Sequence, residues 1–89
     1  MRAVLTVIGK DMVGILAKVS TACAQHRANI IDVNQTVLQD LFAMVMLIDI
    51  RELDCQFSEF QDKMGEMGKE MGMDIHCMHE NIFNSMHKI

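Results

Sequence analysis

The residues best suited to chemistry lie in one short stretch of the chain, Gly9-Lys10-Asp11-Met12-Val13-Gly14-Ile15. This stretch joins an apolar run typical of a strand to an amphipathic run typical of a helix. A helix that starts directly after a strand presents backbone N–H groups that lack intrahelical partners. We expect Asp11 to cap the helix and Gly14, in the first turn, to leave those amides uncovered. The stretch therefore predicts a site for a small polar ligand.

The carboxylate of Asp11 narrows the chemistry of that ligand. A bare anion at this helix start would meet a like charge. A zwitterion can instead pair its ammonium group with Asp11 and its carboxylate with the open amides. An amino acid has this arrangement of charges. The alternative interpretation is purely structural, with Asp11 as an N-cap worth about 1 kcal/mol and Gly14 as a packing residue.

Two further patterns suggest metal binding, and neither holds. The segment His76-Cys77-Met78-His79 contains metal-ligand types. Neighbouring residues of a strand point to opposite faces, however, so no three of these side chains converge. Cys23 and His26 lie one helical turn apart, but Cys23 falls on the apolar stripe. We therefore predict no metal site and no cofactor.

The sequence also lacks the patterns of a catalytic centre. It has no readable Ser-His-Asp or Cys-His constellation and no phosphate-binding loop, so it predicts a protein that is not an enzyme. A small hydrolase of the acylphosphatase type has a similar fold class and length and is the less favoured alternative. Such an enzyme needs an arginine in its first loop, where this chain has Lys10 followed by Asp11.

Length and composition bound the remaining possibilities. The 89 residues predict a single domain, residues 1–89, with a core of about residues 1–78 and a terminal helix of about 79–88. Ten Met and four Phe, without Trp or Tyr, predict an aliphatic, methionine-rich core. A net charge of −4 without a basic stripe argues against nucleic acid and anionic membranes as partners. Three widely spaced cysteines and the lack of a signal peptide favour the cytoplasm.

Hydrophobic periodicity predicts the secondary structure. Along the chain we expect strands over Arg2–Ile8, Asn29–Leu38, Phe42–Ile50 and Met73–Met78, and helices over Met12–Arg27, about Cys55–Met71 and His79–Lys88. Alternation in the second strand predicts that Ile31, Val33 and Val37 share one of its faces. Gly72 is expected to end the second helix.

The order of these elements predicts an α+β, ferredoxin-like βαββαβ sandwich with both long helices on one face of an antiparallel sheet. The first and third strands are expected at the centre. The third strand is apolar on both of its faces, so the face turned away from the helices must also be covered. We expect the terminal helix, a second chain or both to cover it. In so small a chain this favours a homodimer.

The chain resembles the ACT domain family over Met1 to about Met78. The loop Gly9-Lys10-Asp11, the following Gly14-Ile15-Leu16 and Asn29-Ile30 at the opening of the second strand carry the resemblance. Within that superfamily the chain is similar to small stand-alone ACT proteins and to halves of the glycine cleavage system's regulatory repressor. Their C-terminal segment is matched here by His79-Glu80-Asn81-Ile82-Phe83 and Met86-His87-Lys88-Ile89.

The resemblance implies a non-catalytic regulatory domain that binds a small molecule, commonly an amino acid, at a dimer interface. It implies ligand contacts from Asp11 and Asn29, and it places Gly9 where serine-binding members have a histidine. The candidate ligand site then comprises Gly9, Lys10, Asp11, Met12, Val13, Gly14, Ile15, Asn29 and Ile30. The alternative function is a dimeric protein–protein adaptor without a small ligand, which would use the apolar sheet face or the terminal helix.

Overall fold

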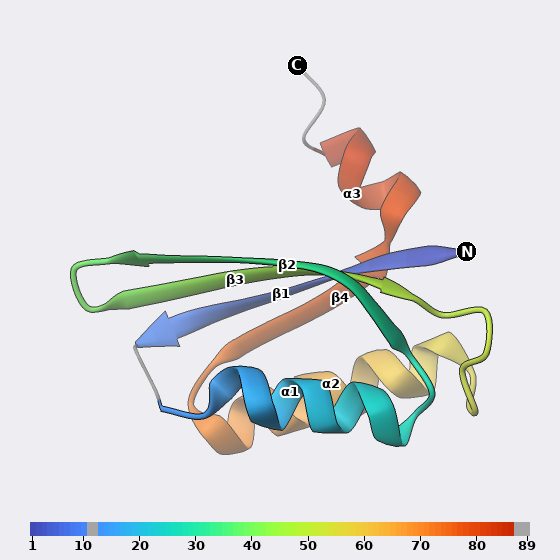
Figure 1. The fold of residues 1–89 in the computed structure, drawn as a ribbon, viewed down its shortest axis with the longest axis horizontal. Helices are drawn as coiled ribbons and strands as arrows, with labels where there is room; N and C mark the ends of the chain where they lie inside the picture. The colour runs from blue at the N-terminus through green and yellow to red at the C-terminus, as the bar shows by residue number, and fades with distance from the viewer. Residues whose placement is uncertain (11–12, 87–89) are drawn as a thin grey trace.

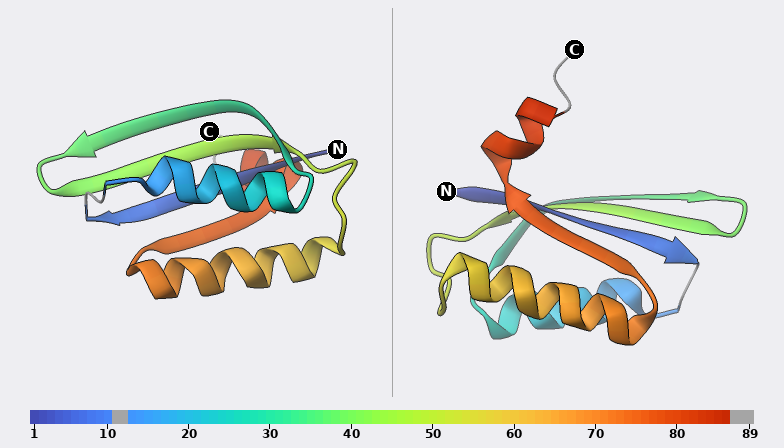
Figure 2. Two further views of the ribbon diagram at one scale, coloured as in Figure 1. Left: turned by 60° about the horizontal axis from the view of Figure 1, so that its bottom comes forward. Right: turned by 180° about the vertical axis from the view of Figure 1, so that it is seen from behind.

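The computed structural model describes residues 1–10 and 13–86 of the chain. Two long helices cover one face of a sheet, and a short third helix stands on the opposite face (Figures 1 and 2). In chain order the elements are β1 (Arg2–Lys10), α1 (Ile15–Gln25), β2 (Asn29–Leu38), β3 (Leu41–Asp49), α2 (Phe57–Met71), β4 (Asp74–His79) and α3 (Glu80–Met86). The predicted α+β, ferredoxin-like fold with a short C-terminal helix is confirmed.

The sheet is antiparallel, with the strand order β2-β3-β1-β4. The first and third strands are therefore central, as predicted, and β2 and β4 are the two edges. α1 lies beneath the β2 side of the sheet and α2 beneath the β4 side (Figure 2). Between the sheet and these helices lies the core, whose largest fully buried side chains are those of Leu5, Val7, Ile15, Val19, Cys23, Met44, Met46, Ile48, Phe60 and Met64.

The edge strand β2 has the predicted bounds, but the predicted sharing of one face is wrong at Ile31. The register between β2 and β3 shifts between Ile30 and Asp32, so Ile31 is the extra residue of a β-bulge. Val33 and Val37 pair with buried residues of β3 and share the face turned toward the helices. The register shift arises from the pairing of β2 with β3. The alternation of residues within β2 alone could therefore not predict it.

Helix α2 ends at Gly72, as predicted, in the left-handed conformation with φ +71°. The N–H of Met73 donates to the carbonyl oxygen of Gly68 at 2.8 Å and satisfies one of the last helical carbonyls. This reversal brings the start of β4 close to the last turns of α2. Among the described residues, no helix combines the length and apolar character needed to cross a membrane.

The terminal helix α3 begins at Glu80, one residue later than predicted, and the predicted end at Lys88 lies outside the described residues. All seven of its residues are described and none of them is buried. On the sheet face nearest to α3, Val4 is buried, whereas Val45 in the next strand is exposed. Phe83, the aromatic residue of α3, is only half-buried. The predicted covering of the outer sheet face is therefore incomplete within one chain.

Two glycines of α2 provide a matched test of this packing. A Cβ added at Gly68 would lie 2.8 Å from the carbonyl oxygen of Met73 and 2.9 Å from Cγ1 of Ile75, whereas one added at Gly65 would meet no described atom within 4 Å. Gly68→Ala should lower the free energy of unfolding by about 1–3 kcal/mol, because the backbone must shift. Gly65→Ala should raise it by up to about 1 kcal/mol through helix propensity.

Urea denaturation of the two variants measures the difference. Equal effects of the two substitutions would contradict the close approach of α2 to the start of β4.

Candidate functional site

The start of α1 differs from the prediction. Gly14 occupies the N-cap position, outside the first turn, in the left-handed conformation with φ +84°. The helix therefore begins at Ile15, and the expected assignment of the N-cap to Asp11 is wrong. A glycine takes this conformation without the steric penalty that a Cβ carries. Asp11 and Met12 lie outside the described residues, so their predicted ligand contacts stay predictions.

No described residue lies over Gly14. No described side chain forms a cap hydrogen bond at this helix start, and a Cβ at Gly14 would meet no described atom within 4 Å. Val13 beside it is 98% exposed, while Ile15 turns into the core. The first amides of a helix have no intrahelical acceptor. No described residue therefore covers the first amides of α1, and the predicted ligand site at this helix start stays a prediction.

Gly9 has a packing role at the end of β1. A Cβ at this position would lie 2.3 Å from Sδ of Met73, so the glycine leaves room for that buried side chain. Lys10 follows with an exposed side chain and pairs with Leu41 of β3. The predicted ligand contacts of Gly9 and Lys10 remain predictions.

Asn29 and Ile30 lie at the other end of the sheet. Arg2 at the start of β1 shares a rung with Asp49, and Asp49 shares one with Asn29. Lys10 lies eight residues along β1, so it is roughly 26 Å from that end at a strand rise of about 3.3 Å per residue. A single chain therefore does not bring Asn29 to the loop after Lys10.

Asn29 and Ile30 instead border a separate hollow of about 390 Å³ at the C-terminal end of α1. Ser20, Arg27 and Glu52 also line it. Arg27 turns the chain between α1 and β2 in the left-handed conformation, with φ +63°. Asn29 is exposed at this corner, which leaves its side-chain amide accessible to a group outside the chain.

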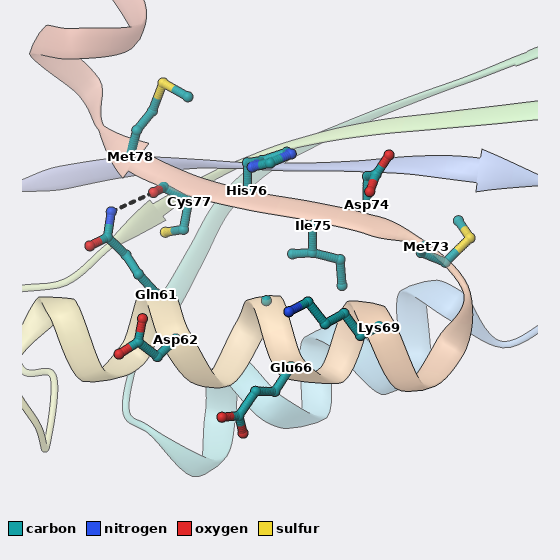
Figure 3. A pocket seen from close by; sticks show the side chains of 11 residues that line it. Gln61, Asp62, Glu66, Lys69, Met73, Asp74, Ile75, His76, Cys77 and Met78 are labelled. Atoms are coloured by element: carbon teal, nitrogen blue, oxygen red, sulfur yellow. Dashed lines mark hydrogen bonds between the residues drawn. The ribbon is translucent and has the colours of Figure 1, made fainter.

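The two edges of the sheet differ in how they are covered. Along β4, the side chain of Gln61 donates to the carbonyl oxygen of Cys77 at 2.7 Å, and α2 runs beside the strand (Figure 3). Asp62, Glu66 and Lys69 of α2 border the same groove of about 580 Å³. Every residue of β2 except Val33 is exposed. The β2 edge is therefore the less covered of the two.

The fold also gathers a polar cluster that the sequence analysis missed. His26 after α1 approaches Asp54 in the β3–α2 connection, with 3.2 Å between Nδ1 and Oδ1, and the N–H of Asp54 donates to the carbonyl oxygen of His26 at 3.1 Å. Their side-chain atoms and Sγ of Cys55 lie within 4.8 Å of one another. These are the described residues whose grouping is compatible with a metal ion. A separation of 28 residues gives no spacing motif that could have revealed the cluster.

None of the three cysteines has the lowered pKa of a nucleophilic thiol. Burial raises the pKa of Cys23 to about 11 and, together with the nearby Cys23, that of Cys77 to about 12. Burial and the neighbouring Asp54 also raise the pKa of Cys55. A thiol whose pKa is raised stays protonated near neutral pH and is a poor nucleophile.

Comparisons with known proteins agree with this architecture. A family model described as an ACT domain matches residues 2–78. A UPF0237 protein of Methanopyrus kandleri is 47% identical over 88 residues, which cover 99% of this chain and 98% of that relative. An ACT domain protein from Streptococcus pneumoniae has a similar solved structure, with a TM-score of 0.82 and 34% identity over 93% of each chain. A putative glycine cleavage system transcriptional repressor shares the fold, with a TM-score of 0.72 and 22% identity over 85% of this chain and 43% of that one.

The contact between His26 and Asp54 gives stability a pH dependence. The hydrogen bond from His26 lowers the pKa of Asp54. Because the folded pKa lies below the unfolded value of about 3.9, the carboxylate stabilises the fold above that pH. This stabilisation is lost as the pH falls through the folded pKa. We expect the wild type to exceed Asp54→Asn in free energy of unfolding at neutral pH, with a difference that shrinks in acid.

Urea denaturation at several pH values measures this difference, with Asp62→Asn on the exposed side of α2 as the control. A difference that stays constant down to the acid range would show that Asp54 acts only through its shape.

Proposed function

The chain belongs to the ACT domain family, and we propose that it is a non-catalytic regulatory protein that binds a small ligand at the interface of a homodimer. By its chemistry the ligand is an amino acid. The observation that best supports the proposal is the division of the candidate site. One half lies at the Lys10 end of the sheet and the other at the Asn29 end. A second chain can reunite the two halves.

The β2 edge is the surface through which the two chains pair. An uncovered edge strand presents backbone N–H and C=O groups that readily pair with another strand. β2 is ten residues long, and Ile31, Val37 and Leu38 are among its exposed side chains. At the other edge α2 runs beside β4, and Gln61 donates a hydrogen bond to one carbonyl oxygen of the strand. Pairing through β2 would satisfy the backbone groups and bury the apolar side chains together.

The register of this pairing determines which residues meet. If two β2 strands pair antiparallel over their full length, Asn29 lies opposite Leu38 of the partner subunit. Within each chain, Leu38 shares a rung with Leu41, and Leu41 shares one with Lys10. Asn29 of one chain would therefore lie at the end of the partner's sheet at which the partner's α1 begins. Each dimer would contain two such composite sites.

The groups at a composite site suit an amino acid. The first amides of α1 beside Gly14 can donate to a carboxylate, and the helix dipole favours a negative group there. The side-chain amide of Asn29 supplies two N–H donors and an acceptor oxygen from the other chain. We assign the ligand's ammonium group to Asp11. A ligand that touches both chains would stabilise the dimer relative to the monomer and so regulate its population.

The free thiols fit a reducing compartment. Cys23, Cys55 and Cys77 are all unpaired. Disulfides are rare in the cytoplasm, where thiols are kept reduced. We therefore place this regulatory dimer in the cytoplasm.

Mixing two defective variants tests whether the site is composite. Gly14→Asn adds a side chain over the helix start, and asparagine tolerates the left-handed conformation that a β-branched residue does not. Asn29→Ala removes the contact from the other chain. A thermal-shift screen of the twenty amino acids first identifies the ligand, and titration calorimetry then measures binding. Each variant alone should lose binding.

An exchanged mixture of the two variants should regain about one quarter of the wild-type sites, because half of the dimers are mixed and each mixed dimer has one intact site. A mixture that regains no sites would place both contacts within one chain. Two variants that each bind like the wild type would place the ligand elsewhere.

A second substitution tests the ammonium contact. A hydrogen bond to a charged group contributes about 1.5–3 kcal/mol. Asp11→Asn removes the charge and retains a side chain of the same size, so the affinity for the amino acid should fall roughly ten- to a hundredfold. Titration of the variant beside the wild type measures the change, and an unchanged dissociation constant would exclude Asp11 from the site.

A further inference from the structure

Three side chains of metal-ligand type converge where the end of α1 meets the connection from β3 to α2. His26 ends α1, and Asp54 and Cys55 precede α2, at the same end of the helical layer (Figure 2). One donor atom of each residue lies within 4.8 Å of the other two. Imidazole nitrogen, carboxylate oxygen and thiolate sulfur are the protein ligands that Zn²⁺ takes. The cluster therefore supplies three of the four ligands of a tetrahedral zinc site.

Backbone and ring contacts hold the cluster in place. The N–H of Asp54 donates to the carbonyl oxygen of His26 at 3.1 Å, and the N–H of His26 donates to that of Cys23 at 3.2 Å. The His26 ring packs in a T-shaped arrangement with the buried ring of Phe60, with 5.8 Å between their centroids. Contacts outside the ligand set orient the ligands of a metal site in this way. The imidazole is thus fixed with Nδ1 toward Asp54.

The spacing of the donor atoms fits a zinc ion after a small movement. Nδ1 of His26 and Oδ1 of Asp54 are 3.2 Å apart. Two ligand atoms that bind zinc at about 2.0–2.1 Å and at the tetrahedral angle are separated by roughly 3.3 Å. A zinc–sulfur distance of about 2.3 Å places the sulfur roughly 3.6 Å from each of them. Only Sγ of Cys55, within 4.8 Å of both atoms, has to come closer.

Charge and exposure also suit a divalent cation. Asp54 and a thiolate at Cys55 carry two negative charges, which balance those of the ion. Glu59 adds negative potential at the Cys55 sulfur, and Lys63 opposes it. The side chains of His26 and Asp54 are 19% and 44% exposed, so an ion can enter from solvent and keep one water as its fourth ligand.

We propose that His26, Asp54 and Cys55 bind one zinc ion per chain. Binding forms a zinc–sulfur bond and releases the thiol proton of Cys55 to the solvent. The ion ties the end of α1 to the segment that leads into α2. The site uses none of the residues assigned to the amino acid and does not depend on the dimer. The proposal departs from the sequence-based prediction of no metal site, because 28 residues separate His26 from Asp54.

Titration calorimetry with zinc chloride tests the proposal on the full chain, untagged and first treated with a chelator. The wild type should bind one ion per chain. Cys55→Ser, which removes the thiolate ligand, should bind at least about tenfold more weakly, and so should Asp54→Asn. With Co²⁺ in place of Zn²⁺, a thiolate-to-cobalt charge-transfer band should appear in the wild type and be absent from Cys55→Ser.

Two matched controls carry the same kinds of substitution outside the cluster. Asp62→Asn and His76→Asn change exposed residues and should bind zinc like the wild type. Circular dichroism checks that each variant is folded, and the cobalt band of the wild type tests for a thiolate ligand without any substitution. A wild type that binds no zinc would overturn the proposal. A cobalt band that persists in Cys55→Ser, or a control that loses binding, would also overturn it by placing the ion elsewhere.

Discussion

The direction of two strands is the constraint on which the rest of the account depends. β1 and β2 each run antiparallel to β3, so they are parallel to each other, and the end of β1 lies at the end of β2. The start of β2, with Asn29, is therefore at the opposite end of the sheet from the loop that follows Lys10. The same topology makes β2 an edge. The division of the candidate site and the open edge thus have one origin, and the proposed antiparallel pairing of two β2 edges would resolve both.

The way in which the helices cover the sheet also supports the proposed association of chains. α2 lies beside the β4 edge and Gln61 binds one of its carbonyl groups, and α2 carries four carboxylates against two lysines, which is half of the net charge of −4. The β2 edge and the sheet face opposite the long helices both keep exposed apolar side chains, among them Val37 and Val45. A chain of 89 residues has too few elements to cover both faces and both edges of a four-stranded sheet. Association of copies is the physical alternative to a larger domain.

Hydrophobic patterns predicted the individual helices and strands, and the order of these elements predicted the arrangement of the sheet. Period-two alternation located β2 to the residue, and the order of elements favoured a single sheet arrangement. The start of α1 was missed because a left-handed Gly14 leaves no trace in hydrophobic periodicity. The loop and Asn29 were each predicted as parts of one site, but their separation in a single chain follows only once strand directions are compared. His26 and Asp54 meet through tertiary structure alone.

Hydrogen exchange of the β2 amides tests the central claim most directly. In a single chain, the β2 amides that point away from β3 face solvent and exchange without protection. Edge pairing predicts that their protection rises with protein concentration and rises further when the amino acid is bound. The amides of β4 that pair with β1 serve as the internal reference and should not change. Unprotected exchange of the outward β2 amides at every concentration, with and without saturating ligand, would contradict the account.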